Sequence, residues 1–171
     1  MSLEETQRVG SWWIWAAVIA FNLLFIYAIF QQLFLGIPFG EKPASDGQLL
    51  LFELIPLVLL LFLFSIRLKT KYNEEGIYYR FYPFQFKITF IAWHELNDAY
   101  MREYRSFYEF GGWGIRKGRT GNAINTSQSG NVGLQLQFHD GRLLLIGTRQ
   151  PAALGKIVEE MIRSGKINRA V

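Results

Sequence analysis

Residues 12–35 read WWIWAAVIAFNLLFIYAIFQQLFL, and no side chain in this run carries a charge at neutral pH. A second run, LLLFELIPLVLLLFLFSI at residues 49–66, is shorter and contains one charged side chain, Glu53. A helix that crosses the hydrocarbon core of a bilayer needs about 20 apolar residues at a rise of about 1.5 Å each. Both runs meet this requirement, the second near its lower limit. The sequence therefore predicts a membrane hairpin of two helices with a connecting loop at residues 36–48.

Two other interpretations of the apolar runs fit less well. Two such runs in succession are a poor match to buried helices of a soluble protein. A cleaved signal peptide has an apolar region of about 7–15 residues and then a small-residue cleavage site. The first run is longer than that, and no A-x-A pattern ends it. We therefore expect both runs to remain in the protein as membrane anchors.

Lysine and arginine near the ends of the apolar runs predict the orientation of the hairpin. Arg67, Lys69 and Lys71 follow the second run, whereas the connecting loop has one lysine, Lys42, and the N-terminal tail has only Arg8. Loops on the cytoplasmic side of a membrane carry an excess of lysine and arginine. We expect a multi-pass protein of the cell (inner) membrane with both termini in the cytoplasm and the loop outside.

After residue 66 the apolar pattern changes to a period of two, which is typical of β-strands. The sequence thus predicts an N-terminal cytoplasmic tail at 1–11, the membrane hairpin at 12–66, and a β-rich cytoplasmic domain at 67–171. Asp140-Gly141 indicates a two-residue hairpin turn, and an apolar stripe at helical spacing follows Pro151. We expect about seven short antiparallel strands and a C-terminal helix. The strand patterns lie at 68–72, 77–82, 87–90, 99–104, 114–119, 122–126, 132–138 and 142–147.

Three stretches carry a resemblance to a known family: KYNEEGIYYRF at 71–81, ITFIAWHELNDAY at 88–100, and LQLQFHDGRLLLIGTRQPAALGKIVEEM at 134–161. Together they resemble the bacterial pleckstrin-homology-like (PH-like) domains over roughly residues 67–163. FGGWGIRKGRTGNAIN at 110–125 is similar to a membrane-anchored subgroup of that family. The resemblance implies a partly open barrel of antiparallel strands capped by a C-terminal helix. It also implies a binding or scaffold module rather than an enzyme.

One departure from that family concerns its lipid ligands. Relatives that bind phosphoinositides use lysines and arginines around the first hairpin of the domain, whereas this chain has Asn73-Glu74-Glu75-Gly76 there. Two carboxylates would repel a phosphorylated headgroup. Inositol-lipid binding at that hairpin is therefore not expected.

The stretch EFGGWGIRKGRTG at 109–121 is rich in glycine and raises the question of a phosphate cradle. A P-loop needs G-x-x-x-x-G-K-[ST], and a dinucleotide fingerprint needs G-x-G-x-x-G before a helix. Gly112, Gly114 and Gly118 have neither spacing, and strands are expected on both sides. The sequence favours a glycine-rich bend with Trp113 packed on a neighbour, with a contact surface as the alternative.

That contact surface would be basic. Arg116, Lys117 and Arg119 lie close together, and Arg102 and Arg105 lie on the preceding strand. If the two strands paired, these five cations could share one edge, with Trp113 inserting at a headgroup boundary. Such a surface suits anionic lipid or an acidic protein partner. The alternative is a solvated strand edge whose charges prevent aggregation.

Two polar residues interrupt the apolar runs. Glu53 would lie about four residues inside the second helix, and charged groups in lipid usually mark a pathway or a partner. A shallow carboxylate can instead extend to the interface or be protonated, which is the interpretation we favour here. Asn22 lies near the middle of the first helix and could donate a hydrogen bond across to the second.

The remaining chemistry is sparse. The chain has no cysteine, so disulfides, thiolate zinc sites and cysteine nucleophiles are excluded. Its two histidines, His94 and His139, lack companions at metal-ligand spacing. Because no catalytic constellation is recognisable either, we expect no metal, no cofactor and no enzymatic activity.

The net charge of the predicted β-rich domain indicates the class of its partner. Residues 67–171 hold 16 lysines and arginines against 9 acids, a net charge of +7. A basic domain tethered beside an anionic leaflet is attracted to it, and tethering makes nucleic acid a weaker expectation. We expect a membrane-anchored binding or scaffold protein that contacts anionic headgroups and a protein partner, the latter unidentified, or a second copy of itself. The alternative is an accessory subunit of a membrane transport or respiratory complex.

Overall fold

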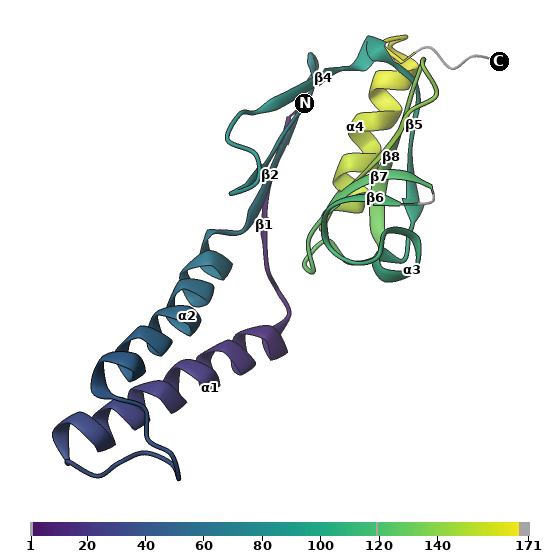
Figure 1. Cartoon of the computed structure of the whole chain (residues 1–171). Coiled ribbons are helices and arrows are strands. Elements are labelled where there is room, and N and C mark those ends of the chain that lie inside the picture. The colour runs from purple at the N-terminus through teal and green to yellow at the C-terminus, as the bar shows by residue number, and fades with distance from the viewer. Residues whose placement is uncertain (1, 119, 168–171) are drawn as a thin grey trace. The chain divides into compact units, whose positions relative to one another are not determined.

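The computed structural model describes residues 2–118 and 120–167 (Figure 1). The chain divides into two compact units. The helical unit consists of Ser11–Ser65, and the β unit consists of the residues up to Gly10 together with those from Ile66 onward. The two-helix hairpin is therefore an insertion within the chain of the β unit.

The helical unit contains α1 (Trp12–Ile29), the π-helix η1 (Phe30–Phe34) that continues it, and α2 (Asp46–Ser65). Both helical segments are long and apolar enough to cross a membrane, so the prediction of two long apolar helices is confirmed. α2 begins before the predicted boundary at Leu49. The reason is a reciprocal cap in which the Ser45 N–H donates to Gln48 Oε1 (3.0 Å) and the Gln48 N–H donates to Ser45 Oγ (3.4 Å).

The helices α1 and α2 are joined by side-chain contacts. The Asn22 amide nitrogen donates to the Val18 carbonyl (2.7 Å) within α1 and to the Pro56 carbonyl (3.2 Å) on α2. The predicted hydrogen bond from Asn22 across to the second helix is therefore confirmed. Near the start of α1 and the end of α2, the ring centroids of Trp15 and Phe64 lie 4.7 Å apart.

The β unit has two sheets in its described residues. Sheet A has the order β1-β2-β3-β4, and sheet B has the order β5-β8-β9-β7-β6. The strands of sheet A are β1 (Leu3–Arg8), β2 (Arg67–Tyr72), β3 (Gly76–Tyr82) and β4 (Thr89–Ala92). Those of sheet B are β5 (Leu96–Glu103), β6 (Gly114–Gly118), β7 (Gly121–Asn125), β8 (Val132–Phe138) and β9 (Leu143–Gly147). The helices are η2 (Trp93–Glu95), α3 (Ser106–Phe110) and α4 (Pro151–Arg163).

β1 differs from the prediction of an N-terminal tail at 1–11. Leu3–Arg8 pairs along its whole length with β2, from Leu3↔Tyr72 to Arg8↔Arg67. The sequence LEETQR has one apolar residue, so its strand pattern is hidden. Its inward side chains, Glu5 and Gln7, are polar and buried.

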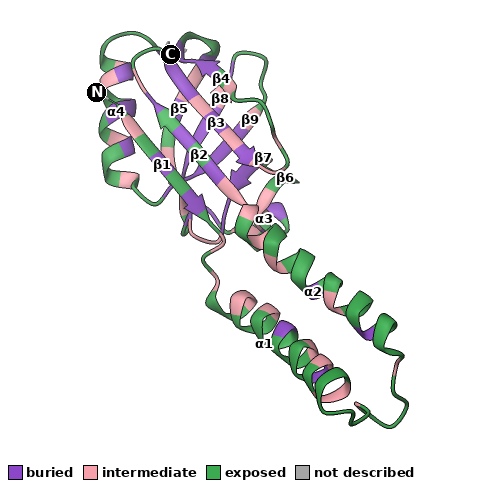
Figure 2. Ribbon diagram, turned by 90° about the vertical axis from the view of Figure 1, so that its left-hand side faces the viewer, coloured by how far each residue is buried: buried purple, intermediate pink, exposed green. Residues whose placement is uncertain are grey.

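The core lies between the sheets and α4. It includes Trp93 from η2 and the apolar stripe of α4, of which Leu154, Ile157 and Val158 are buried. Figure 2 shows buried positions concentrated on the strands of the β unit, while α1 and α2 are largely exposed. A helical and β-rich architecture was thus predicted correctly. The strands form two sheets, and, in the described residues, these do not close into one barrel.

One pairing departs from the antiparallel prediction. β7 and β9 are parallel neighbours, with Asn122↔Leu144 to Ile124↔Ile146 in register. The chain leaves β7, forms β8, and returns through the Asp140-Gly141 turn, so β9 comes to lie beside β7. The predicted hairpins at 114–126 and 132–147 are confirmed as β6–β7 and β8–β9.

Candidate functional site

The glycine-rich stretch forms a bend between α3 and β6. Gly111 ends α3 in the left-handed region (φ 71°), and Gly112 and Gly114 have φ of 127° and 110°. Side chains other than glycine rarely adopt these angles, which explains the glycines without a ligand. Trp113 packs edge-on against Phe107 at 4.8 Å between ring centroids.

The five predicted cations do not share one strand edge. β5, which carries Arg102, and β6, which carries Arg116 and Lys117, are the opposite edges of sheet B and do not pair. Arg102 is also engaged, because its guanidinium donates to Glu109 (2.8 Å) and to Gln135 Oε1 (2.9 Å). The expectation of a common edge is therefore wrong, while Arg105 is exposed and Arg119 lies outside the described residues.

Glu109 fixes this region. Its carboxylate accepts hydrogen bonds from the Arg105 N–H (2.8 Å) and from Thr120 Oγ1 (3.4 Å), besides the ion pair with Arg102. Burial alone would raise the pKa of Glu109, but the Arg105 amide and the Arg102 guanidinium hold it below its usual value. Glu109 thus acts as a structural anion that ties α3 to β5 and to the β6–β7 turn.

Arg116 and Lys117 line an open groove of about 490 Å³ between β4 and the β6–β7 hairpin. Arg142 and the carboxylate of Glu95 also line it. Its apolar lining includes Ile91, Phe138 and Leu144. Contact of an acidic or anionic partner with Arg116 and Lys117 remains a prediction.

A second basic surface lies on the outward face of sheet A. The alternation along β2 points Leu68 and Thr70 inward and Arg67 and Lys69 outward. The strand register groups the outward residues into rows that cross the sheet. The first row holds Arg8, Arg67 and Tyr82, the second holds Thr6, Lys69 and Arg80, and the third holds Glu4, Lys71 and Tyr78.

Charge is distributed unevenly over these rows. In the third row Lys71 pairs with Glu4 (2.8 Å), which lowers the pKa of Glu4, and the Tyr78 hydroxyl donates to Glu75 (2.7 Å). The first two rows contain four cations and no acid. Arg8, Arg67, Lys69 and Arg80, hereafter the basic rows, have no ion pair in the part of the chain that the structure describes.

An exposed apolar loop follows the same end of the sheet. Pro83–Ile88, hereafter the aromatic loop, connects β3 to β4 and holds Phe84, Phe86 and Ile88, which are 58%, 74% and 62% exposed. Ring contacts orient it: Phe86 meets Tyr82 edge-on at 5.9 Å between centroids. The Arg67 guanidinium lies 5.1 Å from the centroid of the Tyr82 ring.

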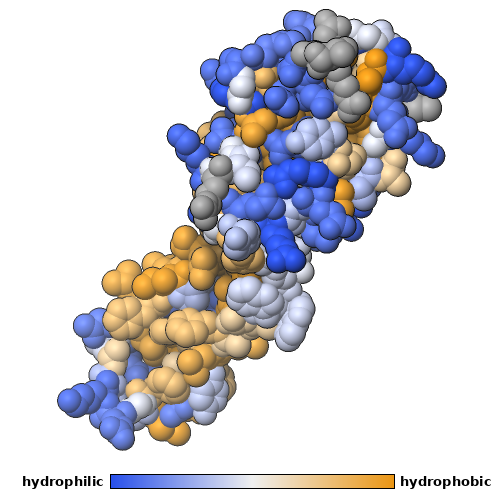
Figure 3. All heavy atoms as spheres, turned by 90° about the vertical axis from the view of Figure 1, so that its right-hand side faces the viewer, coloured by the Kyte–Doolittle hydropathy of each residue, from blue (hydrophilic) through white to orange (hydrophobic). Residues whose placement is uncertain are grey.

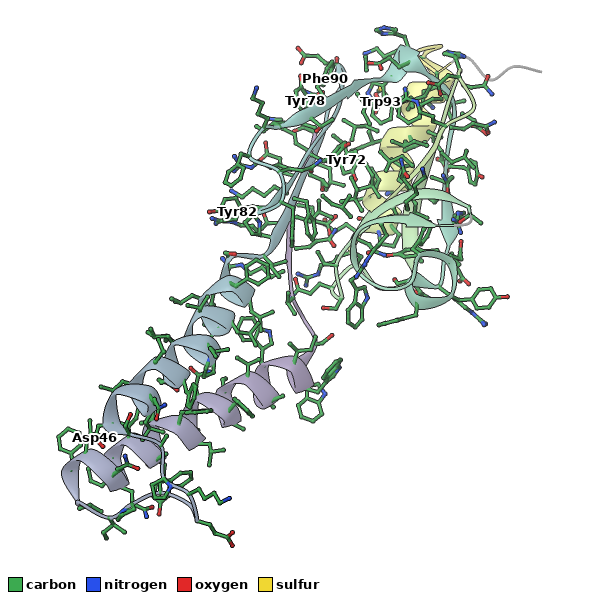
Figure 4. The ribbon with its side chains drawn as sticks, viewed as in Figure 1. Asp46, Tyr72, Tyr78, Tyr82, Phe90 and Trp93 are labelled. Atoms are coloured by element: carbon green, nitrogen blue, oxygen red, sulfur yellow. The ribbon has the colours of Figure 1, made fainter. Side chains whose placement is uncertain are left out.

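The basic rows and the aromatic loop share the end of sheet A where the hairpin is inserted, hereafter the hairpin end. β1 ends there at Arg8, four residues before α1, and β2 begins there at Arg67, two residues after α2. Tyr82 pairs with Arg67, so β3 also ends there. Tyr78 and Phe90, with ring centroids 4.6 Å apart, lie toward the opposite end (Figure 4).

In the sequence, Arg67 and Lys69 indicated only the orientation of the hairpin, and this surface was not predicted. The alternation R-L-K-T-K at 67–71 was visible as a signal for one basic face. Its pairing with Arg8 and Arg80 was not visible, because it depends on β1 and on the register of β3.

In the helical unit, the side chains are mostly apolar and exposed, as the hydropathy colours of Figure 3 show. Because α2 begins at Asp46, Glu53 lies seven residues and so about 10 Å from the start of the helix, farther than the four residues predicted. Its Oε2 atom has no hydrogen-bond partner among the described residues. The Gln32 amide nitrogen, which was not among the predicted site groups, donates to the Ala44 carbonyl just before α2 and to Asp46 Oδ1 at the start of α2, both at 2.8 Å.

Comparison with known proteins leaves the family open. No model of a known protein family matches the chain, and no curated protein matches it.

Proposed function

We propose that this protein is a membrane-anchored binding or scaffold module, without catalytic activity, whose PH-like β unit works at the cytoplasmic surface of the cell membrane. Anionic lipid headgroups and a protein partner are its proposed ligands. A second copy of the chain is a further candidate partner, and nucleic acid is not among them.

The observation that supports this proposal most directly is the insertion of the hairpin between two paired strands. Arg8 and Arg67 are register partners in sheet A, and the chain reaches Trp12 only four residues after Arg8. Four extended residues span at most about 14 Å. A β unit connected in this way stays at the surface of the membrane in which the helices are embedded.

The same pairing constrains the topology. Because Arg8 and Arg67 are neighbours, the chain enters and leaves the hairpin on one side of the membrane. Two crossings satisfy that condition and a single crossing does not. The cations at the hairpin end favour the cytoplasmic side.

Single-cysteine labelling tests the topology, since the natural chain has no cysteine. Glu41→Cys places a thiol in the connecting loop, and Glu159→Cys places one on the exposed face of α4. We expect a membrane-impermeant maleimide to label E41C in intact cells and E159C only after the membrane is opened. Labelling of E159C in intact cells would overturn the cytoplasmic assignment.

One observation favours the alternative of an accessory subunit in a larger membrane complex. Glu53 holds an oxygen without a partner about 10 Å along α2, and intramembrane carboxylates usually face a partner or an ion path. Purification in mild detergent distinguishes the two functions. A stoichiometric complex that dissociates in E53Q supports the subunit; a protein that purifies alone, unchanged by E53Q, supports the module.

A further inference from the structure

We infer that the aromatic loop inserts Phe84 and Phe86 into the lipid interface while the basic rows bind the anionic headgroups above it. The β unit would then contact the bilayer through this loop, in addition to its two chain connections to the helices. This inference rests on the membrane anchoring proposed above and assigns a lipid site to the β unit.

The aromatic loop lies at the hairpin end of sheet A. β3 ends at Tyr82, the register partner of Arg67, and Arg67 lies two residues after the last residue of α2. The aromatic loop starts at the next residue, Pro83. It therefore starts at the end of sheet A where the chain passes into the apolar helices.

The aromatic loop exposes several large apolar side chains close together in the sequence. Single exposed apolar side chains are common on protein surfaces, but adjacent ones mark an interaction site. Phe84, Phe86 and Ile88 are all more than half exposed and lie within five residues. Lys87 is exposed among them. Large apolar side chains beside a lysine are the composition of segments that lie in the headgroup and acyl boundary.

The cations of the basic rows and the acids on the outward face of sheet A lie toward opposite ends. The basic rows are the two rows of sheet A nearest the hairpin end, where the loop starts. Their four cations have no ion pair in the described ranges 2–118 and 120–167. Of the acids in and next to sheet A, Glu5 is buried on the inward face, and the others lie toward the opposite end, at Glu4 and in the Glu74-Glu75 turn. This polarity directs cations toward an anionic leaflet and acids away from it. An acidic protein would match the charges but would not explain why they gather where the chain enters the hairpin.

Spin labelling of the full chain in vesicles tests the inference, because the chain has no cysteine of its own. Phe86→Cys carries the label in the loop. Glu159→Cys is the control, because Glu159 is an exposed residue of α4 and lies on neither predicted lipid-contact surface. Val58→Cys, on the exposed face of α2, is the positive control for lipid. Accessibility to oxygen and to a water-soluble nickel complex gives the depth of each label.

We expect the label at position 86 to lie about 5–10 Å below the headgroup level and the label at 159 to remain in water. A label at 86 as accessible to nickel as the one at 159 overturns the inference, provided that the label at 58 is in lipid. If the label at 58 is also in water, the membrane anchoring itself fails.

A second arm tests the headgroups. In vesicles with anionic lipid, the label at 86 should lie deeper than in purely zwitterionic vesicles. Lys69→Gln in the F86C background should reduce that difference, because it removes an unpaired cation of the second row. Lys71→Gln, on the same strand and face but paired with Glu4, is the matched control and should reduce it less. An equal effect of both substitutions would overturn the role of the basic rows.

Discussion

Buried polar side chains of β1, in sheet A, bind to β9 of sheet B and to the residues that follow β7 and β9. Glu5 accepts hydrogen bonds from Thr148 Oγ1 and the Arg149 N–H, both at 2.7 Å. Gln7 donates to the Gly147 carbonyl (2.8 Å) and accepts from Thr126 (3.0 Å) and from Ser129. Buried polar groups that are fully hydrogen-bonded specify one packing, and each becomes costly when its partner is removed.

Gln7→Ala should therefore destabilise the β unit by about 2–3 kcal/mol, because it leaves the Gly147 carbonyl and two hydroxyls without their partner. Thr6→Ala, at the exposed neighbouring position, is the control and should change stability by less than about 0.5 kcal/mol. Thermal unfolding of the full chain in mild detergent gives both values. Equal stability of the two variants would contradict the proposed role of the Gln7 contacts.

Glu109→Gln tests the anion that ties α3 to sheet B. The pKa of Glu109 is lower in the folded protein than in the unfolded chain, so its ionisation stabilises the fold above the unfolded pKa. That contribution is lost as the pH falls through the lower, folded pKa. We expect E109Q to cost about 1–2 kcal/mol at pH 7 and the difference from wild type to shrink below about pH 4. Glu159→Gln is the exposed control, and a pH-independent loss in E109Q would argue against the charge.

At the scale of elements, the sequence predicts those helices, strands and turns whose pattern has a local cause. The strands with alternating apolar residues, the Asp140-Gly141 turn and the Pro151 helix start were all predicted. β1 was missed because its inward residues are polar, and the parallel β7–β9 pair was missed because it is set by non-local packing. The basic rows could not be assembled from sequence, since they depend on β1 and on the strand register.

Two glycines in different elements should respond to alanine with opposite signs. A Cβ at Gly155, inside α4, would make an ordinary 3.7 Å contact with Met101, so G155A should stabilise the helix by about 0.5–1 kcal/mol. A Cβ at Gly118, in β6, would overlap the Glu109 carbonyl oxygen, so G118A should destabilise by about 1–3 kcal/mol. Denaturant unfolding of the two variants checks the signs, and stabilisation by G118A would show that α3 does not approach β6 as closely as described.

At the scale of the whole molecule, the β unit is one fold built from two separated segments of the chain. The hairpin interrupts it between β1 and β2, and the residues on either side pair with each other. A fragment that begins at Ile66 would leave β2 as an unprotected edge, and exposed edges promote aggregation. It would also leave the partners of Glu5 and Gln7 unsatisfied.

We therefore expect that replacing residues 11–65 by about four glycine and serine residues yields a β unit that is folded and monomeric without detergent, because paired strands lie only about 5 Å apart. The matched control is the same polypeptide without residues 1–10, which should aggregate or lose its protection from protease. Size-exclusion chromatography and hydrogen exchange of the β7 and β8 amides distinguish the two. If the control is as soluble and as protected as the joined chain, β1 is dispensable, and the argument that the paired strands hold the β unit at the membrane surface loses its basis.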